Sequence, residues 1–164
     1  MKFVDAHIHL SDEEYADCTD EVLTEAKNAN VVALVSNSMD LITGISTLKL
    51  AEKFPGTVYA ALGIHPWTVN SLTEEELQQT LKLISEQKNN KTRVAIGETG
   101  LDSKYENTWE KQLRFFDQML HLAERLDLPA IIHSRGATAK IIELLPSYRI
   151  KKILLHWFSG SFST

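Results

Sequence analysis

Short apolar stretches rich in β-branched residues alternate along the chain with longer segments in which apolar residues recur every three or four positions. The short stretches predict strands at residues 2–5, 31–36, 57–63, 93–97, 129–132 and 152–155. Their apolar residues are nearly continuous, which predicts burial on both faces of a sheet. Strands that alternate with helices in this way are typical of β/α units around a parallel sheet. The pattern therefore predicts an α/β fold with six strands and about five helices.

Capping residues indicate where the helices begin and end. Thr73 precedes three glutamates in the form of a capping box, and Thr19 precedes an acidic first turn in the same manner. The longest predicted helix covers residues 106–126, and another covers 137–145 and ends at a proline. No linker or internal sequence repeat interrupts the pattern, so residues 1–164 are interpreted as one domain.

Length and charge narrow the function classes. The 164 residues are 43% apolar and 24% charged, which indicates one globular domain and excludes collagen-like, disordered and coiled-coil chains. A closed (β/α)₈ barrel usually needs about 250 residues, so length alone argues against one. The net charge of −5 comes with no basic tract, so a polyanionic substrate would have to be held locally.

The N-terminus and the cysteine content predict a cytoplasmic protein. Asp5 and His7 stand where a signal peptide would need an unbroken apolar stretch, and no apolar run approaches the roughly 18 residues of a membrane span. Cys18 is the single cysteine and cannot form an internal disulfide, which fits a reducing compartment. We therefore expect a cytoplasmic protein without a membrane partner.

Five of the six histidines and one glutamate come directly after the predicted strands. They are His7, His9, His65, Glu98, His133 and His156. The carboxyl ends of strands build the sites of α/β sheets and barrels, so these side chains should converge. Burying so many polar groups without partners would cost several kcal/mol, which favours a divalent metal site over core packing.

Each candidate ligand also has a structural interpretation. His7 and His9 form a His-Ile-His triplet, and the period of two in a strand would put both imidazoles on one face, suited to one divalent cation. Taken alone, they fit equally well as two hydrogen-bonded groups at a strand end. Glu98 can bridge two cations, or it can cap the next segment or pair with Arg135.

Other polar residues carry less weight. His65 is followed by a proline that turns the chain away, so substrate contact is favoured over metal ligation. Arg135 and Lys104 lie on loops at the same face and could hold phosphate oxygens, although such residues are often merely solvated. His121 lies on the polar side of a helix and is interpreted as a surface residue, and Cys18 as inert.

Five motifs carry these residues and span the chain. They are Val-Asp-Ala-His-Ile-His-Leu at 4–10, Gly-Ile-His-Pro at 63–66, Ile-Gly-Glu-Thr-Gly-Leu-Asp at 96–102, Leu-Pro-Ala-Ile-Ile-His-Ser-Arg at 128–135 and His-Trp-Phe-Ser-Gly-Ser at 156–161. In this order the motifs resemble the TatD family of metal-dependent hydrolases, within the amidohydrolase superfamily of (β/α)₈ barrels. Two departures are Trp67, where another histidine is frequent, and Trp157, where cysteine is common.

The resemblance implies a deoxyribonuclease that hydrolyses the phosphodiester bonds of DNA with two divalent cations, such as zinc, magnesium or manganese. In such a site the cations turn water into hydroxide and offset the charge on phosphate oxygens. The implied roles are first-cation ligands for His7 and His9, a bridging role in water activation for Glu98, second-cation ligands for His133 and His156, and contacts near the scissile phosphate for His65 and Arg135.

The same resemblance implies a TIM-type (β/α)₈ barrel of which this chain supplies about six units. The family pattern ends with an aspartate after the eighth strand that binds the first cation, and nothing after Thr164 provides it. We therefore expect residues 1–164 to be a single hydrolase domain that lacks its last two β/α units. An open sheet would expose its first and sixth strands as apolar edges, so the chain alone should aggregate or associate.

Two other functions fit the same residues. A related barrel hydrolase could act with similar ligands on an amide or an ester, such as an aminoacyl ester. Without the last aspartate, the chain could instead be a catalytically inactive metal-binding fragment.

Overall fold

The computed structural model describes residues 1–160, apart from the side chain of Lys88. The strands in this part of the chain are β1 (Phe3–Ile8), β2 (Val31–Asn37), β3 (Val58–Leu62), β4 (Arg93–Gly100), β5 (Ala130–His133) and β6 (Ile153–His156). The α-helices are α1 (Thr19–Asn28), α2 (Leu41–Lys53), α3 (Pro66–Val69), α4 (Glu74–Glu86), α5 (Trp109–Leu126) and α6 (Thr138–Leu144). Short 3₁₀ helices are η1 (Glu13–Tyr15), η2 (Gln87–Asn89), η3 (Ser103–Thr108) and η4 (Leu145–Ser147).

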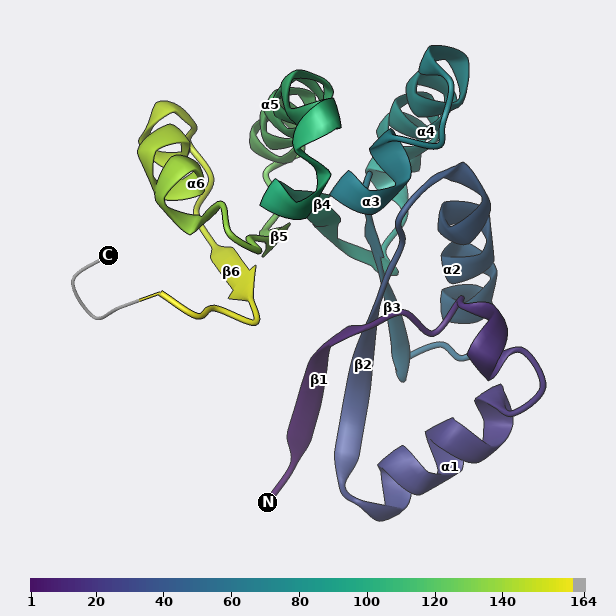
Figure 1. The fold of residues 1–164 in the computed structure, drawn as a ribbon. Coiled ribbons are helices and arrows are strands. Elements are labelled where there is room, and N and C mark those ends of the chain that lie inside the picture. The colour runs from purple at the N-terminus through teal and green to yellow at the C-terminus, as the bar shows by residue number, and fades with distance from the viewer. Residues whose placement is uncertain (161–164) are drawn as a thin grey trace.

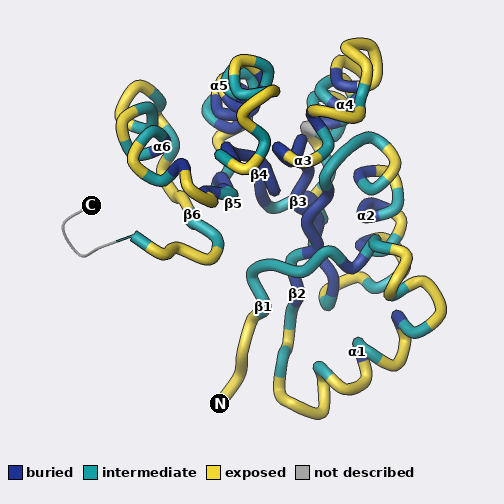
Figure 2. The backbone as a smooth tube through the Cα atoms, viewed as in Figure 1, coloured by how far each residue is buried: buried dark blue, intermediate teal, exposed yellow. Residues whose placement is uncertain are grey.

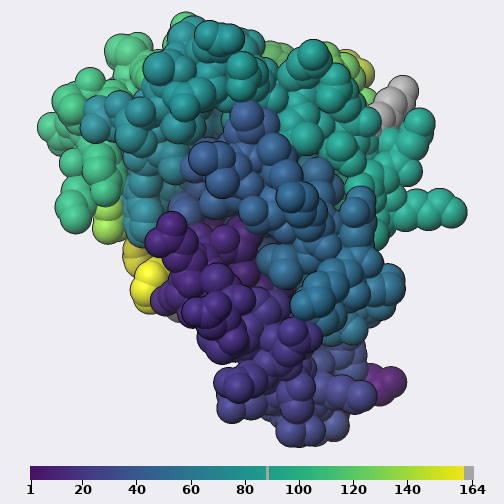
Figure 3. Space-filling view, turned by 90° about the vertical axis from the view of Figure 1, so that its right-hand side faces the viewer, coloured from purple at the N-terminus to yellow at the C-terminus, as the bar shows by residue number. Residues whose placement is uncertain are grey.

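The six strands form one parallel sheet in the order β1-β2-β3-β4-β5-β6. Figure 1 shows that this sheet curves and that the helices lie along its convex side. In the space-filling view, side chains of these helices form the outer surface (Figure 3). Neighbouring strands that follow one another in the chain, with helices outside, form the arrangement of a TIM-type barrel. The predicted fold, with six β/α units, is confirmed.

The main hydrophobic core lies between the sheet and the helices. Phe115 and Phe116 of α5 are buried there with Ile96 of β4, in one cluster that runs from the first β/α unit to the last helix. Residues at alternate positions of the strands form a second cluster on the inner face, made of Ala61, Ala95 and Ile131. The central strands are therefore buried on both faces. In Figure 2 the tube is largely dark blue, the colour of buried residues, along β3 and β4.

The structure corrects several predicted boundaries. Strand β4 continues past residue 97 to Gly100, so Glu98 lies inside the strand instead of following it. The strand is longer than its apolar run because β4 continues to pair with β5 through Thr99 and Gly100. Strand β1 likewise extends through His7 to Ile8. The helix predicted at residues 106–126 begins as α5 only at Trp109, after the separate 3₁₀ segment η3.

Two glycines allow the carboxyl ends of the central strands to approach closely. A Cβ atom on Gly63 would lie 2.4 Å from the backbone oxygen of Glu98. A Cβ atom on Gly100 would lie 2.0 Å from the backbone oxygen of His133. Any side chain at either position would force the strands apart. Glycine there is thus a condition for holding the Glu98 and His133 side chains in one site.

Burial on both faces was a wrong prediction for the edge strands. Val4 of β1 is 61% exposed, and Phe3 and Ile153 are also exposed. Among the described residues, β1 and β6 each pair with a strand on one side only. Their outer edges present free backbone groups next to apolar side chains, the combination that promotes pairing with another chain.

We expect the 164-residue chain to self-associate through these edges. On size-exclusion chromatography with light scattering, it should elute as dimers or larger species. The double variant Val4→Lys with Ile153→Lys should raise the monomer fraction, because a lysine on an edge strand opposes strand pairing. The matched control is Ile42→Lys, where the isoleucine is 76% exposed on α2, a helix that packs against β3 and β2 and is not part of an edge strand. A monodisperse wild-type monomer with a cooperative melt would contradict the prediction.

Candidate metal centre

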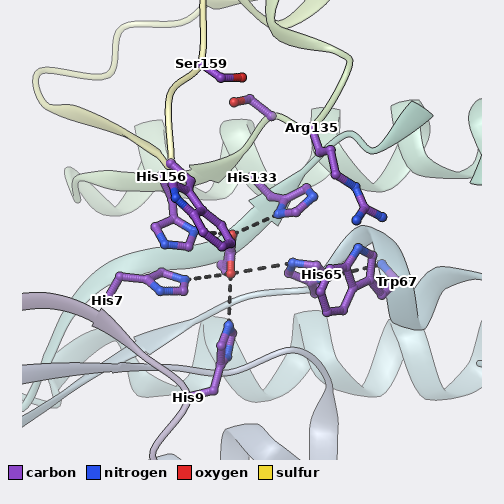
Figure 4. A pocket seen from close by; sticks show the side chains of 11 residues that line it. His7, His9, His65, Trp67, His133, Arg135, His156 and Ser159 are labelled. Carbon is purple, nitrogen blue, oxygen red and sulfur yellow. Dashed lines mark hydrogen bonds and ion pairs between the residues drawn. The ribbon is translucent and has the colours of Figure 1, made fainter. Parts of the chain in front are cut away.

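A cavity of about 450 Å³ opens at the carboxyl ends of the strands (Figure 4). Its lining includes all seven residues that the sequence singled out as site residues, whereas Lys104 is not among the lining residues. The lining residues are His7, His9, His65, Trp67, Glu98, His133, Ser134, Arg135, His156, Trp157 and Ser159. The predicted convergence of strand ends thus brings five histidines and one glutamate into one cavity.

The Glu98 carboxylate stands at the centre of this cavity and is only 1% exposed. Two oxygens of a carboxylate offer about four lone-pair positions, yet five imidazoles surround this one. Near Oε2 lie Nε2 of His7 at 2.6 Å, Nε2 of His9 at 3.1 Å and Nε2 of His65 at 3.5 Å; near Oε1 lie Nδ1 of His133 and Nδ1 of His156, both at 3.2 Å. More nitrogens converge than hydrogen bonds to Glu98 can use.

The His9 ring is held in one tautomer. Its Nδ1 lies 2.9 Å from the backbone carbonyl oxygen of Asn37, which can only accept, so Nδ1 carries the proton. The Nε2 lone pair then faces Glu98 Oε2, and these two acceptors require a proton or a cation between them. Burial lowers the pKa of His9, but the hydrogen bond and charge of Glu98 outweigh it and leave the pKa raised.

His133 is oriented in the same way from the other side. Its Nε2 donates to Oδ2 of Asp102 at 3.0 Å, so the lone pair of Nδ1 faces Glu98 Oε1. A carboxylate that holds the far nitrogen of an imidazole is the usual support for a metal ligand. Each oxygen of Glu98 therefore faces an imidazole lone pair that a separate partner fixes in place.

His65 has the opposite tautomer. Its Nδ1 accepts a hydrogen bond from the backbone N–H of Trp67 at 3.2 Å, at the start of α3, so its proton is on Nε2 and points toward Glu98. By distance alone, the ligand atoms of His65, Glu98 and His133 could hold one metal ion. Those of His7, Glu98 and His156 could hold another. The protonated Nε2 makes His65 a hydrogen-bond donor to the site. Burial lowers the pKa of His65 to about 4, so its ring is neutral near pH 7.

The rings of His7 and His156 stack with their centroids 3.4 Å apart, which joins the ends of β1 and β6 across the opening of the sheet. Burial lowers the pKa of His156, and the electrostatic effect of the neighbouring His7 also lowers it. Burial opposes ionisation of Glu98, but the imidazoles that surround its carboxylate outweigh this effect and hold the pKa of Glu98 well below its usual range. A neutral imidazole and an ionised carboxylate are the forms that bind metal ions, so the donor set fits divalent cations.

Asp102 is a site residue that the sequence analysis missed. Its buried carboxylate accepts hydrogen bonds from Trp67 Nε1 at 2.6 Å, His133 Nε2 at 3.0 Å, Arg135 Nε at 3.1 Å and the backbone N–H of Lys104 at 2.9 Å. The proposed pairing of Arg135 with Glu98 is therefore wrong, because Arg135 pairs with Asp102 instead. Burial raises the pKa of Asp102, but these donors, Arg135 foremost, lower it to about 2.

Residues 4–164 match the family model described as TatD related DNase. The chain belongs to this family. The human "Deoxyribonuclease TATDN3" is 36% identical over 168 residues, which cover 96% of this chain and 61% of the relative. The Erwinia tasmaniensis "3'-5' ssDNA/RNA exonuclease TatD" is 29% identical over 160 residues, which cover 96% of this chain and 60% of the relative.

A solved TatD homologue, YjjV from Escherichia coli, superposes with a TM-score of 0.88 at 31% identity. The match covers 97% of this chain and 61% of that one, and YjjV is named an uncharacterized metal-dependent hydrolase. This chain thus has the fold of a TatD-family metal-dependent hydrolase. It spans about three fifths of the length of the relatives it matches.

The structure places His121 and Cys18 outside the lining of the cavity. His121 is exposed on α5 beside Asp117 and Glu124, as expected of a surface residue of this TatD-family chain. Cys18 is a free thiol that contacts the backbone of η1 instead of the site. Among residues 1–160, no helix has both the length and the apolar composition to cross a membrane. Ser161, the last residue of the fifth motif, lies outside the described residues.

We expect Asp102→Asn to lower the free energy of unfolding by about 2 kcal/mol near pH 7. The pKa of Asp102 is about 2 in the folded chain, below the 3.8 of a free side chain, so the ionised form stabilises the fold above that ordinary value. The difference between wild type and variant should therefore shrink as pH falls from about 4 toward about 2. Urea unfolding at several pH values measures it. The control Asp20→Asn removes an exposed ion pair with Lys53 and should change little; equal losses in both variants would refute the prediction.

Proposed function

We propose that this chain is the catalytic domain of a metal-dependent deoxyribonuclease that hydrolyses phosphodiester bonds. The proposal rests on the buried Glu98 carboxylate. Each of its oxygens faces the lone pair of an imidazole, and a separate hydrogen-bond partner fixes each of these imidazoles. The family description and the name of the human relative support DNA as the substrate. The hydrolase class itself follows from the family.

We propose two divalent cations on opposite sides of Glu98. His7 and His9, near Oε2, would hold the first cation, and His133 and His156, near Oε1, the second. Glu98 would bridge both. When bound, the cations would supply hydroxide at neutral pH and offset charge on the phosphate. Imidazole and carboxylate ligands suit zinc and manganese, and magnesium less well.

The remaining side chains would position the phosphate. Arg135 uses Nε and Nη2 on Asp102, which leaves other N–H groups of its guanidinium for phosphate oxygens. The neutral His65 ring lines the same cavity with its proton on Nε2 and would lie near the scissile phosphate. These local donors would let a chain of net charge −5 hold a polyanion.

We also propose that residues 1–164 are one hydrolase domain and form six units of an eight-unit barrel. The unpaired outer edges of β1 and β6 and the 61% coverage of the E. coli structure support this division. In this arrangement, a further unit would carry the acidic ligand that completes the first cation site.

The single free thiol, Cys18, supports a cytoplasmic location.

Cleavage assays on single- and double-stranded DNA test the function. With magnesium, manganese, cobalt or zinc present, we expect cleavage that a chelator abolishes. Glu98→Gln should slow it by roughly 100-fold or more, comparable to the loss of a transition-state donor in other enzymes. His133→Ala should also slow cleavage, because it removes a proposed ligand. Its matched control is His121→Ala, which changes an exposed histidine that does not line the cavity. No cleavage with any of the four metals would refute the deoxyribonuclease. Activity on an aminoacyl ester or an amide instead would assign the site to another barrel hydrolase.

Elemental analysis separates metal binding from catalysis. We expect the purified chain to contain divalent metal, and His7→Ala and Glu98→Ala to lower its metal content because each removes a proposed ligand. His121→Ala should leave the content unchanged. Unchanged metal in both site variants would show that these residues do not form the metal site. Bound metal without hydrolysis of any substrate would favour a catalytically inactive fragment.

A further inference from the structure

Trp67 is a half-exposed aromatic side chain that the structure holds rigidly at the cavity. The residue is 45% exposed, although its neighbours Pro66 and Val69 in α3 are buried. Its indole N–H donates to Asp102 Oδ2 at 2.6 Å, and its ring lies edge-to-face with that of His65, at 4.7 Å between centroids. The orientation of the indole is therefore fixed, while almost half of the residue remains open to a ligand.

The guanidinium of Arg135 lies over one side of this ring and is held by the same carboxylate. The guanidinium carbon of Arg135 is 5.5 Å from the centroid of Trp67, and its Nη2 is 2.8 Å from Asp102 Oδ2. The Arg135 side chain is 47% exposed. The buried Asp102 carboxylate thus holds an aromatic surface and a positive charge next to each other. Both side chains line the cavity that holds Glu98 (Figure 4).

We propose that Trp67 is a stacking platform for a nucleobase of a single-stranded nucleic acid whose phosphate lies against Arg135. This subsite deepens the proposed function and rests on it for the phosphate. Aromatic side chains beside cations are the usual means of holding single strands, because every base has a stacking face. A base inside a duplex has both faces covered, so the platform favours single strands or frayed ends. The cavity of about 450 Å³ has the size of a site for a small ligand.

Binding measurements in a chelating buffer test the subsite without catalysis. The full chain is titrated into a labelled short oligothymidylate and into an abasic strand of equal length, and fluorescence anisotropy is read. We expect wild type to bind the thymine strand roughly 5- to 150-fold more tightly than the abasic strand, the range that stacking of one base supplies. Trp67→Ala should lose this preference and bind the abasic strand as wild type does.

Trp67→Phe separates stacking from positioning. It keeps an aromatic ring but removes the N–H that Asp102 accepts, so it should retain most of the preference for thymine. Equal losses of Trp67→Ala on both strands would show that Trp67 only positions Asp102 and Arg135, and would overturn the proposal. Equal affinity of the wild type for both strands would also overturn the proposal, and that measurement needs no variant. A loss of preference in Trp157→Ala but not in Trp67→Ala would place the stacking on the other exposed tryptophan of the cavity, and would also overturn it.

The outcomes for the subsite and for the proposed function are distinct. Preference for thymine through Trp67, with no cleavage by any metal, would refute the nuclease and leave the subsite standing. Metal-dependent cleavage of DNA, with no effect of Trp67→Ala on thymine preference, would support the nuclease and overturn the subsite. A blunt duplex of matched length should depend less on Trp67 than the single strand does, and equal dependence would contradict the stated preference for single strands.

Discussion

Glu98 carries a charge on a side chain that is almost fully buried, and the surrounding groups have to compensate for that burial. An unpaired ion in such a place would cost several kcal/mol. Here the imidazoles of five histidines converge on the two carboxylate oxygens from strands and strand ends that are far apart in the chain. The low pKa of Glu98 is the direct result of that arrangement. Every feature that keeps these strand ends together therefore supports the charge state of the site.

The barrel architecture supplies that convergence. Parallel strands in chain order direct all their carboxyl ends toward one face, and the buried helix faces on the convex side hold the sheet in its curve. The glycines at positions 63 and 100 let neighbouring backbones approach to distances that a side chain would prevent. The stack of His7 on His156 then brings together the ends of the two edge strands. The packing of helices outside the sheet and the close approach of strands within it thus both hold the strand ends together.

Asp102 connects the proposed metal site of the cavity to the proposed substrate contacts. It fixes the tautomer of His133, which faces Glu98, and it also anchors Arg135 and Trp67 at the cavity. A shift of this carboxylate would alter a proposed metal ligand, a phosphate contact and a stacking surface at once. Through Arg135, this carboxylate also places a positive charge at the proposed phosphate site of a chain whose net charge is −5.

The amino-acid sequence alone was enough to predict the β/α order, the six strands and seven of the eleven residues that line the cavity, because apolar periodicity and strand ends are properties of local chain segments. The Glu98 motif already placed a carboxylate between two glycines at the end of an apolar run. The three-dimensional fold was needed to show that β4 runs on to Gly100, that Arg135 pairs with Asp102, and that His65 points its proton at Glu98. These features depend on interstrand register and on loops that return to the site, so contacts between distant residues set them. Local periodicity records burial along one segment, and it carries no information on which of the converging polar groups will meet.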